Sequence, residues 1–490
     1  MKPIAIDFET YLISNEQPAP RPVCLSYYDG QEKGILLKED ARNFIKDILS
    51  KDYLIIAQNL KFESLVIYEH YPELRDLIWK AYDENRVYCT QIYEKLLNNI
   101  REKQNSQTSL AGLVDYYFKV DISAGKKDPD AWRLRYSELD GVALKDWPKE
   151  AIEYSIQDSV WAYKVYLQQL KQERLDDSVS LKADFALNLM AQKGILVDKE
   201  KVDTLEKELI TALQPSYNLL INKGFCEKVK GKYKKKKKLF IEHLETLNTQ
   251  LKYTPKGNVS TSLEDLKTYY SVSQDEIIRA FLDIAEYEKV LTAFVSNLKQ
   301  ADPVIRTEYN AVVSSGRTSS RKSRAYPSVN IQQMPRSVSG VTWDVRNCYI
   351  PRPGFKLVSI DYAGLELAST ANQLFKIYGK SQMQSTINSG DIPIDMHSKL
   401  ACKIMSMKKK KNITYEEFIN NKKEKEYAHF RQLSKPINLG FPGGIGYDTM
   451  RILLARDDIF PNLEVLHQSH SEKEIKYYLS RFYNKCAGLL

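Results

Sequence analysis

The chain of 490 residues is poor in cysteine, and its six cysteines are widely separated. No two of them form a C-x-x-C pair, which argues against a structural zinc site and favours reduced thiols. Long hydrophobic runs are also missing: no stretch approaches the length of a membrane span, and the N-terminus lacks the apolar core of a signal peptide. These absences predict a cytoplasmic protein with no membrane partner.

Positive charge exceeds negative charge only modestly. The chain carries 72 Lys and Arg against 63 Asp and Glu, a net charge of +9, which permits binding to a polyanion without demonstrating it. Lysines are concentrated in two runs, Lys234–Lys238 and Lys408–Lys411. Each run is compatible with a solvated loop or with contacts to a phosphate backbone, and neither implies recognition of a base sequence.

The chain as a whole is globular by composition, with 43% hydrophobic and 28% charged residues, and its length suits roughly three domains. Its first half contains two kinds of pattern. Residues 1–180 combine strand patterns, such as Tyr53–Ala57, with helical patterns, such as Ala151–Gln169. Residues 181–300 are mostly helical by pattern, and Asp198 has the position of a helix N-cap.

The second half of the chain changes character twice. Residues 301–335 are rich in Ser, Arg, Asn and Gln, which predicts irregular structure. The apolar run Leu357–Ile360 predicts a buried strand that leads through a turn into a helix. Helical patterns return from about residue 397 onward. The pattern thus changes near residues 180, 300, 335 and 397.

Two carboxylates, Asp7 and Glu9, follow a short apolar run near the N-terminus. Side chains at i and i+2 of a strand share a face, so this pair can bind divalent cations, and carboxylate oxygens suit Mg²⁺ or Mn²⁺. Two such ions can activate a water and stabilise the leaving oxygen of a phosphodiester. Further candidates are Glu63 and the pair Tyr154 and Asp158, which are i and i+4 on one helix. Each piece alone is equally typical of a surface carboxylate or an interfacial tyrosine.

A second group of polar residues begins at Asp361, directly after the predicted strand. An Asp at a strand end can bind the metal ion that lowers the pKa of an attacking hydroxyl, or it can be an ordinary helix N-cap. Farther along, Arg431 and Lys435 are i and i+4 on a predicted helix. They can face one triphosphate, or they can be two exposed cations on a solvated helix face.

In order and spacing, the first group resembles the DEDDy-type 3′–5′ proofreading exonucleases found on DNA polymerases of family A. The resemblance covers residues 1–180 and implies an α/β domain with an RNase H-like mixed sheet. It implies that Asp7, Glu9 and Asp158 bind metal ions and that Tyr154 orients the attacking water. Glu63 is the remaining catalytic candidate: it stands where the family usually has Asp after N-x-x-F, and it keeps the charge but adds a methylene.

The second group resembles the polymerase body of the same family, most closely its phage-type members. Arg431-x-x-x-Lys435-x-x-Asn438 is similar to the family's O-helix, and Asp395-Met396-His397 is similar to its D-I-H element near the triphosphate. With the exonuclease domain over 1–180, the resemblance implies an α+β right hand with a helical thumb over 181–300, a partial palm over 301–396 and fingers over 397–490, after which the palm is incomplete. It implies catalytic metal binding by Asp361. The other implied contacts are to the nucleotide, by Glu366, His397, Arg431, Lys435 and Leu439, and to DNA, by Arg317, Asn330 and Gln333.

Several residues depart from the family pattern. Leu439 stands where the family usually has Phe or Tyr, and Gly443 stands where it has Tyr. Pro436 falls inside the predicted helix, where it is expected to kink the helix or begin it. No second palm aspartate in a His-Asp-Glu turn follows Gly444. We therefore expect the isolated chain to polymerise poorly or not at all. Two explanations are open: a second polypeptide completes the palm, or the sequence is truncated.

Three functions are compatible with these patterns. The first is a template-directed DNA polymerase with a 3′–5′ proofreading exonuclease, which uses two-metal sites, a DNA primer–template and dNTPs, in the host cytoplasm if phage-encoded. The second is a metal-dependent 3′–5′ exonuclease with a non-polymerising DNA-binding body. The third is a non-enzymatic nucleic-acid-binding subunit. The intact set of three acids and one tyrosine in residues 1–180 argues against the third. The second is disfavoured by the retained residues Asp361, Glu366, Arg431 and Lys435.

Overall fold

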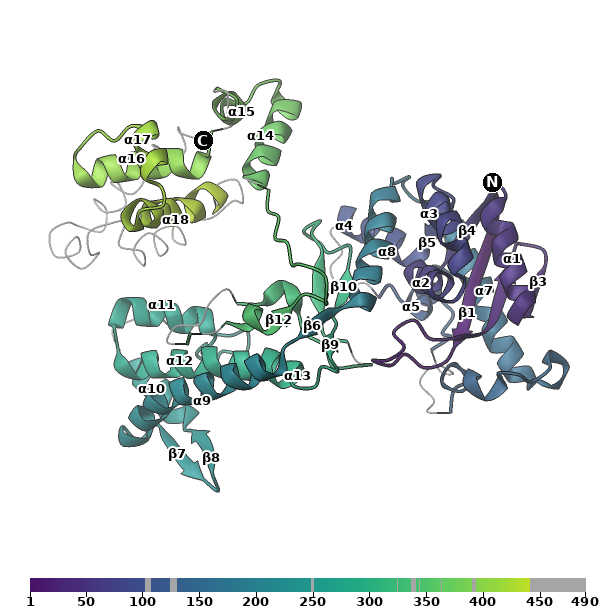
Figure 1. Ribbon diagram of the computed structural model, residues 1–490, viewed down its shortest axis with the longest axis horizontal. Coiled ribbons are helices and arrows are strands. Elements are labelled where there is room, and N and C mark those ends of the chain that lie inside the picture. The colour runs from purple at the N-terminus through teal and green to yellow at the C-terminus, as the bar shows by residue number, and fades with distance from the viewer. Residues whose placement is uncertain are drawn as a thin grey trace. The chain divides into compact units, whose positions relative to one another are not determined.

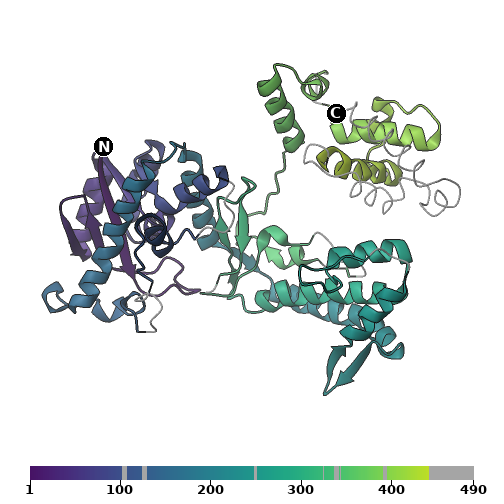
Figure 2. The ribbon, with the colours of Figure 1, turned by 180° about the vertical axis from the view of Figure 1, so that it is seen from behind.

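The computed structural model describes residues 1–101, 107–123, 130–247, 251–323, 325–335, 341–342, 344–362, 364–389 and 394–440. The chain consists of two compact units. The first contains Met1–Ser216 and Asp283–Lys356, and the second contains Tyr217–Leu282 and Leu357–Leu490. The chain runs from purple to yellow in Figure 1, and Figure 2 shows it from behind. Within the described ranges, no helix is long and apolar enough to cross a membrane.

A five-stranded mixed sheet forms the centre of the first unit (Figure 1). Its strand order is β3-β2-β1-β4-β5, and β1 pairs antiparallel with β2 and parallel with β4. The predicted strand Tyr53–Ala57 is confirmed as β4. The other strands are β1 (Lys2–Thr10), β2 (Pro22–Tyr28), β3 (Lys33–Leu37) and β5 (Val87–Cys89).

Helices cover both faces of this sheet because both faces of β1 are apolar at alternate positions. Ile4, Ile6 and Phe8 pack on one face with apolar residues of α1, α2, α3 and α8. Ala5 points to the opposite face, where α7 packs. The helix predicted over 151–169 is confirmed as α7. The helices of this part are α1 (Lys38–Ser50), α2 (Leu60–His70), α3 (Arg75–Asp83), α4 (Thr90–Ile100), α5 (Leu110–Phe118), α7 (Lys149–Gln169) and α8 (Ser178–Lys193).

Short strands connect the end of α8 to residues 301–350. A three-stranded sheet has the order β12-β6-β9, and a separate hairpin joins β10 to β11. Gly194 follows the last residue of α8 and has φ +57°. A side chain at this position would place its Cβ atom only 2.6 Å from the carbonyl oxygen of Ile305. Three of these strands, β9, β10 and β11, lie within residues 301–335, so the expectation of irregular structure there was only partly right. The strands are β6 (Ile195–Val197), β9 (Val304–Ile305), β10 (Glu308–Asn310), β11 (Ser319–Arg321) and β12 (Tyr349–Ile350).

The middle of the chain is mostly helical, as predicted. Asp198 accepts a hydrogen bond from the Lys201 amide at 3.2 Å, which confirms its N-cap role. The first lysine run lies on a β-hairpin and the start of α10, and Tyr233 of the hairpin stacks on Tyr217 with ring centroids 3.8 Å apart. The elements are α9 (Lys199–Asn222), β7 (Cys226–Val229), β8 (Lys232–Lys235), α10 (Lys237–Thr246), α11 (Leu263–Ser273), α12 (Glu276–Val290), a π-helical turn (Leu291–Val295) and α13 (Ser296–Leu298).

The C-terminal described part is a group of helices around an apolar core from α16, α17 and α18. The predicted helices from residue 397 onward are confirmed up to Gly440, and Gly443, Gly444 and the remaining C-terminal residues lie outside the described ranges. Pro436 does not begin a helix, because α18 starts at Lys425 and continues through it. The helices are α14 (Leu365–Tyr378), α15 (Gln382–Ile387), α16 (Met396–Lys409), α17 (Tyr415–Asn421) and α18 (Lys425–Gly440).

The prediction of a buried strand at Leu357–Ile360 is wrong. These residues form neither helix nor strand, and the side chains of Val358 and Ile360 are 77% and 88% exposed. An apolar run is buried as a strand only where neighbouring strands and a covering layer are present. Among the described residues no strand pairs with this run. The predicted helix after it is confirmed as α14.

Candidate active sites

Asp7 and Glu9 lie on the face of β1 that α7 covers. They alternate with Ile6 and Phe8, whose side chains pack on the opposite face, and thus share the side of Ala5. In register, Asp7 is opposite Ser26 of β2 and Glu9 is opposite Cys24. The strand pattern near the N-terminus therefore places both carboxylates toward one helix.

Ser155 lies between the predicted residues Tyr154 and Asp158 in the sequence, and it binds α7 to the sheet. The hydroxyl of Ser26 donates to the backbone oxygen of Ser155 at 2.8 Å, and the Cys24 sulfur lies 3.7 Å from the Ser155 hydroxyl. Ser155 is fully buried, as expected for a contact between helix and sheet. These bonds fix the rotation of α7 about its axis, and with it the positions of Tyr154 and Asp158.

The electrostatics of Tyr154 link the four predicted residues. Burial raises the pKa of the Tyr154 phenol, and the charges of Asp158, Glu9 and Asp7 raise it further, whereas Arg133 lowers it. Coulombic effects of this kind require proximity. The structure thus brings Asp7, Glu9, Tyr154 and Asp158 together from β1 and α7. The tyrosine remains protonated at neutral pH and can donate a hydrogen bond.

Glu63 differs from the other acids. It lies in the first turn of α2 and is 3% exposed, and its Oε2 atom has no hydrogen-bond partner. Burial raises the pKa of this carboxyl to about 8. A buried carboxylate without a partner is costly, so the neutral acid is the stable form of Glu63 when no cation is near. Its membership of the site stays a prediction.

The acidic group has the right kind of ligand atoms for a hard divalent cation, but these atoms are not close enough together to hold one. Asp7, Glu9 and Asp158 offer carboxylate oxygens, the ligands that Mg²⁺ and Mn²⁺ prefer. Over the ranges that the structure describes, however, no three His, Cys, Asp or Glu side chains are close enough to hold one ion together. Binding an ion here requires these carboxylates to close around it, and the Oε2 atom of Glu63 is a further oxygen in need of a partner.

The predicted DNA-contact segments meet at the β10–β11 hairpin. Asn330 accepts a hydrogen bond from Ser320 at 2.6 Å, and Gln332 donates to the Thr318 hydroxyl at 2.8 Å. Arg317 and Gln333 belong to the same two segments and are exposed. Residues 317–320 and 330–333 therefore form one polar surface, although the sequence alone did not indicate their contact.

The second candidate site lies where the N-terminus of α16 meets α18. Asp395 caps α16, since its Oδ1 accepts the His397 amide at 3.0 Å, while its Oδ2 lies 2.8 Å from Nε of Arg431. Burial raises the pKa of Asp395, but bonds from Arg431 and Ser398 outweigh burial and hold it below its ordinary value. An ionised Asp395 therefore orients Arg431.

His397 is surrounded by charged groups from three helices. Burial lowers its pKa below the ordinary value, Arg431 and Lys435 lower it further, and Asp395 and Glu366 oppose them. Glu366 of α14 and the α16–α18 residues are thus close in space. Arg431 and Lys435 are cations and His397 is a further N–H donor, so these predicted residues suit an anionic ligand, although the acids Asp395 and Glu366 lie beside them.

The remaining predicted residues are placed less tightly. Leu439 packs against an apolar cluster that includes Leu367 and Met396, so it joins α14 to the α16–α18 group. Asp361 is exposed within the irregular segment before α14. Its role as a metal ligand stays a prediction.

Sequence reasoning missed how two buried residues hold His397, although it included one of them, Asn438, in the helix pattern. Ser434 donates to the His397 backbone oxygen at 2.7 Å, and Asn438 lies 3.1 Å from the His397 ring nitrogen Nδ1. One signal was available: Arg431, Lys435 and Asn438 follow i, i+4 and i+7 spacing, which places them along one side of a helix.

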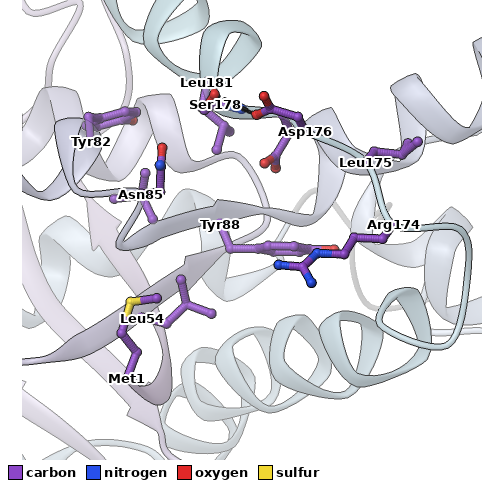
Figure 3. A pocket seen from close by; sticks show the side chains of 12 residues that line it. Met1, Leu54, Tyr82, Asn85, Tyr88, Arg174, Leu175, Asp176, Ser178 and Leu181 are labelled. Atoms are coloured by element: carbon purple, nitrogen blue, oxygen red, sulfur yellow. Dashed lines mark hydrogen bonds between the residues drawn. The ribbon is translucent and has the colours of Figure 1, made fainter.

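A cavity of about 520 Å³ lies at the end of the sheet opposite Asp7 and Glu9 (Figure 3). Its walls include Met1, Leu54 and Val87, where β1, β4 and β5 begin. Arg174 points toward Tyr88 across it (Figure 3). None of the predicted site residues lines this cavity, so it is separate from the acidic group.

Comparison with known proteins supports a polymerase-like fold. No family model matches the sequence. The structure is similar to the polymerase domain of Pol1 from M. smegmatis, solved in complex with a DNA primer–template and dNTP. The TM-score is 0.58 at 14% identity, and the match covers 93% of this chain and 72% of that chain. At this identity the likeness establishes a shared mixed α/β fold, and activity has to be argued from the residues.

Proposed function

We propose that this chain acts on DNA as a family A-type polymerase with a DEDDy-type 3′–5′ exonuclease in its N-terminal domain. The observation that carries the proposal is the convergence of Asp7 and Glu9 on β1 with Tyr154 and Asp158 on α7. Carboxylates gathered around a phenol, on a fold similar to that of a solved polymerase domain, are suited to metal-assisted cleavage of a phosphodiester.

In the exonuclease site, Asp7, Glu9 and Asp158 would hold the divalent ions, with Glu63 as a further ligand. Mg²⁺ or Mn²⁺, when bound there, supplies charge stabilisation and a more acidic water. Tyr154 keeps its proton because of burial and the neighbouring carboxylates, so its hydroxyl donates a hydrogen bond that orients the attacking water. Ser155 keeps Tyr154 and Asp158 in register with β1.

In the polymerase body, we assign nucleotide binding to the group around His397. Arg431 and Lys435 supply positive charge for a triphosphate, and Glu366 lies near enough to affect His397 and would adjoin the sugar. Leu439 offers an apolar contact to the base. The surface with Arg317, Asn330 and Gln333 would contact the primer–template.

Contacts to the DNA backbone are assigned to the lysine hairpin, defined as β7, β8 and their turn. Lys232, Lys234 and Lys235 of β8 are exposed, and the stacked pair Tyr233 and Tyr217 holds the hairpin on α9. An ordered strand of lysines presents charge at regular spacing, which favours phosphate contacts over a solvated loop.

The catalytic acid Asp361 needs at least one more carboxylate to hold two metal ions. We propose that this acid comes from a segment outside the described ranges or from a second polypeptide. The exposed segment 357–360, which pairs with no strand in the described part of the chain, favours a second candidate function. That function is a 3′–5′ exonuclease whose body grips DNA without polymerising.

A primer–template with a 5′-labelled primer tests both functions. With Mg²⁺ and no dNTP, the exonuclease predicts shortening of the primer from its 3′ end. In Ca²⁺, which is expected to permit binding without rapid chemistry, the polymerase body predicts tighter DNA binding when the dNTP complementary to the template base is added. Shortening without any dNTP-dependent change in affinity would select the second candidate function. The absence of both shortening and a dNTP effect would refute the proposal.

A further inference from the structure

The side-chain amide of Asn438 makes two hydrogen bonds to the start of α16. Its nitrogen Nδ2 donates to the backbone oxygen of Met396 at 3.0 Å and lies 3.1 Å from the ring nitrogen Nδ1 of His397. Asn438 is fully buried and His397 is 9% exposed, so water does not substitute readily for either bond. This contact joins the predicted nucleotide-binding histidine to the last turn of α18.

The two bonds together determine where the histidine carries its proton. A backbone carbonyl oxygen only accepts, so the end of the amide that faces Met396 must be the NH₂ group. The same nitrogen faces Nδ1 of His397, which must then accept the second hydrogen. An imidazole that accepts at Nδ1 is neutral and carries its hydrogen on Nε2.

Other groups around the ring agree with a neutral imidazole in a fixed orientation. The backbone of His397 is held on both sides, by Asp395 accepting its amide at 3.0 Å and by Ser434 donating to its oxygen at 2.7 Å. The charged groups that act on the ring are Glu366 of α14, Asp395 at the α16 cap, and Arg431 and Lys435 of α18. Burial and the two cations lower the pKa of His397, which disfavours the imidazolium.

We propose that Asn438 is a positioning residue that fixes His397 as its Nε2–H tautomer, so that the ring presents a neutral N–H donor beside Arg431 and Lys435. The anion that accepts this bond is a nucleoside triphosphate, an identification that rests on the proposed function. A neutral donor adds directional recognition of an oxygen to the charge that the two cations provide.

Nitrogen NMR of the full chain, labelled with ¹⁵N in the histidine rings, tests the tautomer directly. The sequence has six histidines, and His397→Gln identifies the resonances of this one. The proposal predicts a protonated Nε2 and an unprotonated Nδ1 in the wild type. Asn438→Asp has the same shape but only accepts, so it should move the proton to Nδ1. Ser434→Ala removes the hydroxyl contacts to the backbone oxygens of His397 and Arg431 but leaves the Asn438 contact to the ring, so it should keep the Nε2–H form.

Asn438→Ala provides a second variant in case the buried carboxylate introduced by Asn438→Asp prevents folding, and it should give a mixture of tautomers. A wild-type ring protonated at Nδ1, or an Nε2–H form that persists as the sole tautomer in a folded Asn438→Ala protein, would overturn the proposal. Titration of the labelled protein with a dNTP and Ca²⁺ then separates this inference from the proposed function. We expect Asn438→Ala to weaken dNTP binding about tenfold or more, and a wild-type Nε2–H ring that binds no dNTP would refute only the function.

Discussion

Two nitrogens of the Arg431 guanidinium, Nε and Nη2, each lie 2.8 Å from the same carboxylate oxygen of Asp395. Asp395 also caps α16 through its other oxygen, at 3.0 Å from the His397 amide. One carboxylate thus orients a cation of α18 and begins the helix that carries His397. Asp395 therefore holds both Arg431 and the start of α16 in place in the candidate nucleotide site.

Replacing Asp395 with Ala should destabilise the α16–α18 group by about 1 to 3 kcal/mol, because it removes a helix cap and a partly buried ion pair together. Hydrogen exchange of the α16 and α18 amides measures this. Thr414→Ala is the matched control, since Thr414 caps α17 at 3.1 Å and should cost only about 1 kcal/mol. Equal effects of the two substitutions would show that the Arg431 contact contributes nothing.

The exonuclease assignment predicts the effect of three single substitutions. Asp7→Asn and Asp158→Asn should each reduce Mg²⁺-dependent shortening of DNA by at least about a thousandfold, since each removes a charge from the metal-binding group. Tyr154→Phe should reduce it by about ten- to a hundredfold, because the orienting hydroxyl is lost while the ring packing is kept. Single-turnover rates on single-stranded DNA measure these effects. Asp76→Asn, at an exposed acid in α3, is the control and should leave the rate unchanged.

The buried acid Glu63 predicts a pH-dependent stability. Its pKa is raised to about 8 in the folded protein by burial, so between the ordinary glutamate range and pH 8 the folded state holds a proton that the unfolded state releases. Stability should therefore fall as pH rises from about 4.5 to 8. Glu63→Gln should remove this loss and stabilise the protein at pH 8 by on the order of 2 to 4 kcal/mol.

Urea unfolding in EDTA at pH 5.5 and pH 8, followed by signals from the N-terminal unit, measures this difference. Adding Mg²⁺ provides a further arm: if Glu63 is a metal ligand, Mg²⁺ should stabilise the wild type at pH 8 more than the Gln variant. A wild type and variant with the same pH dependence would contradict the assignment of a neutral Glu63.

The sequence was sufficient to predict elements whose pattern is local. Asp7 and Glu9 are two residues apart on β1, and Tyr154 and Asp158 are one turn apart on α7. Each pair was predicted to share a face of its element, because strand and helix geometry alone determine this. Leu357–Ile360 failed for the opposite reason: whether an apolar run is a buried strand depends on partners elsewhere in the chain. The protonation state of Glu63 likewise depends on its tertiary surroundings.

In the second site, sequence identified the charged residues and missed what holds them. Arg431 and Lys435 were predicted from their spacing. The contact of Asn438 with His397 joins residues 41 positions apart, and a polar residue in a helix gives no sign of which distant group it meets. Buried polar contacts of this kind are specified by packing, which a single sequence does not reveal.

The lysine hairpin predicts sequence-independent DNA binding. Changing Lys232, Lys234 and Lys235 to Gln should weaken binding to all DNA sequences alike and reduce the slope of log affinity against log salt by up to about 2.7. Fluorescence anisotropy at several salt concentrations measures the slope. The control removes the same charge from Lys409, Lys410 and Lys411, two of which pair with Glu426 and Glu417. A change of base preference, or an equal effect of the control, would contradict the assignment.

The central claim is that two separate groups of residues act on the same DNA, and one comparison tests it most directly. The comparison uses the wild type, Asp7→Asn and the double variant Arg431→Ala/Lys435→Ala. Two properties are measured for each: shortening of a labelled primer with Mg²⁺, and the gain in DNA affinity that a dNTP causes with Ca²⁺. We predict that Asp7→Asn loses shortening and keeps the dNTP effect, and that the double variant loses the dNTP effect and keeps shortening. Wild-type shortening that persists in Asp7→Asn, or a dNTP effect that persists without both cations, would contradict the account.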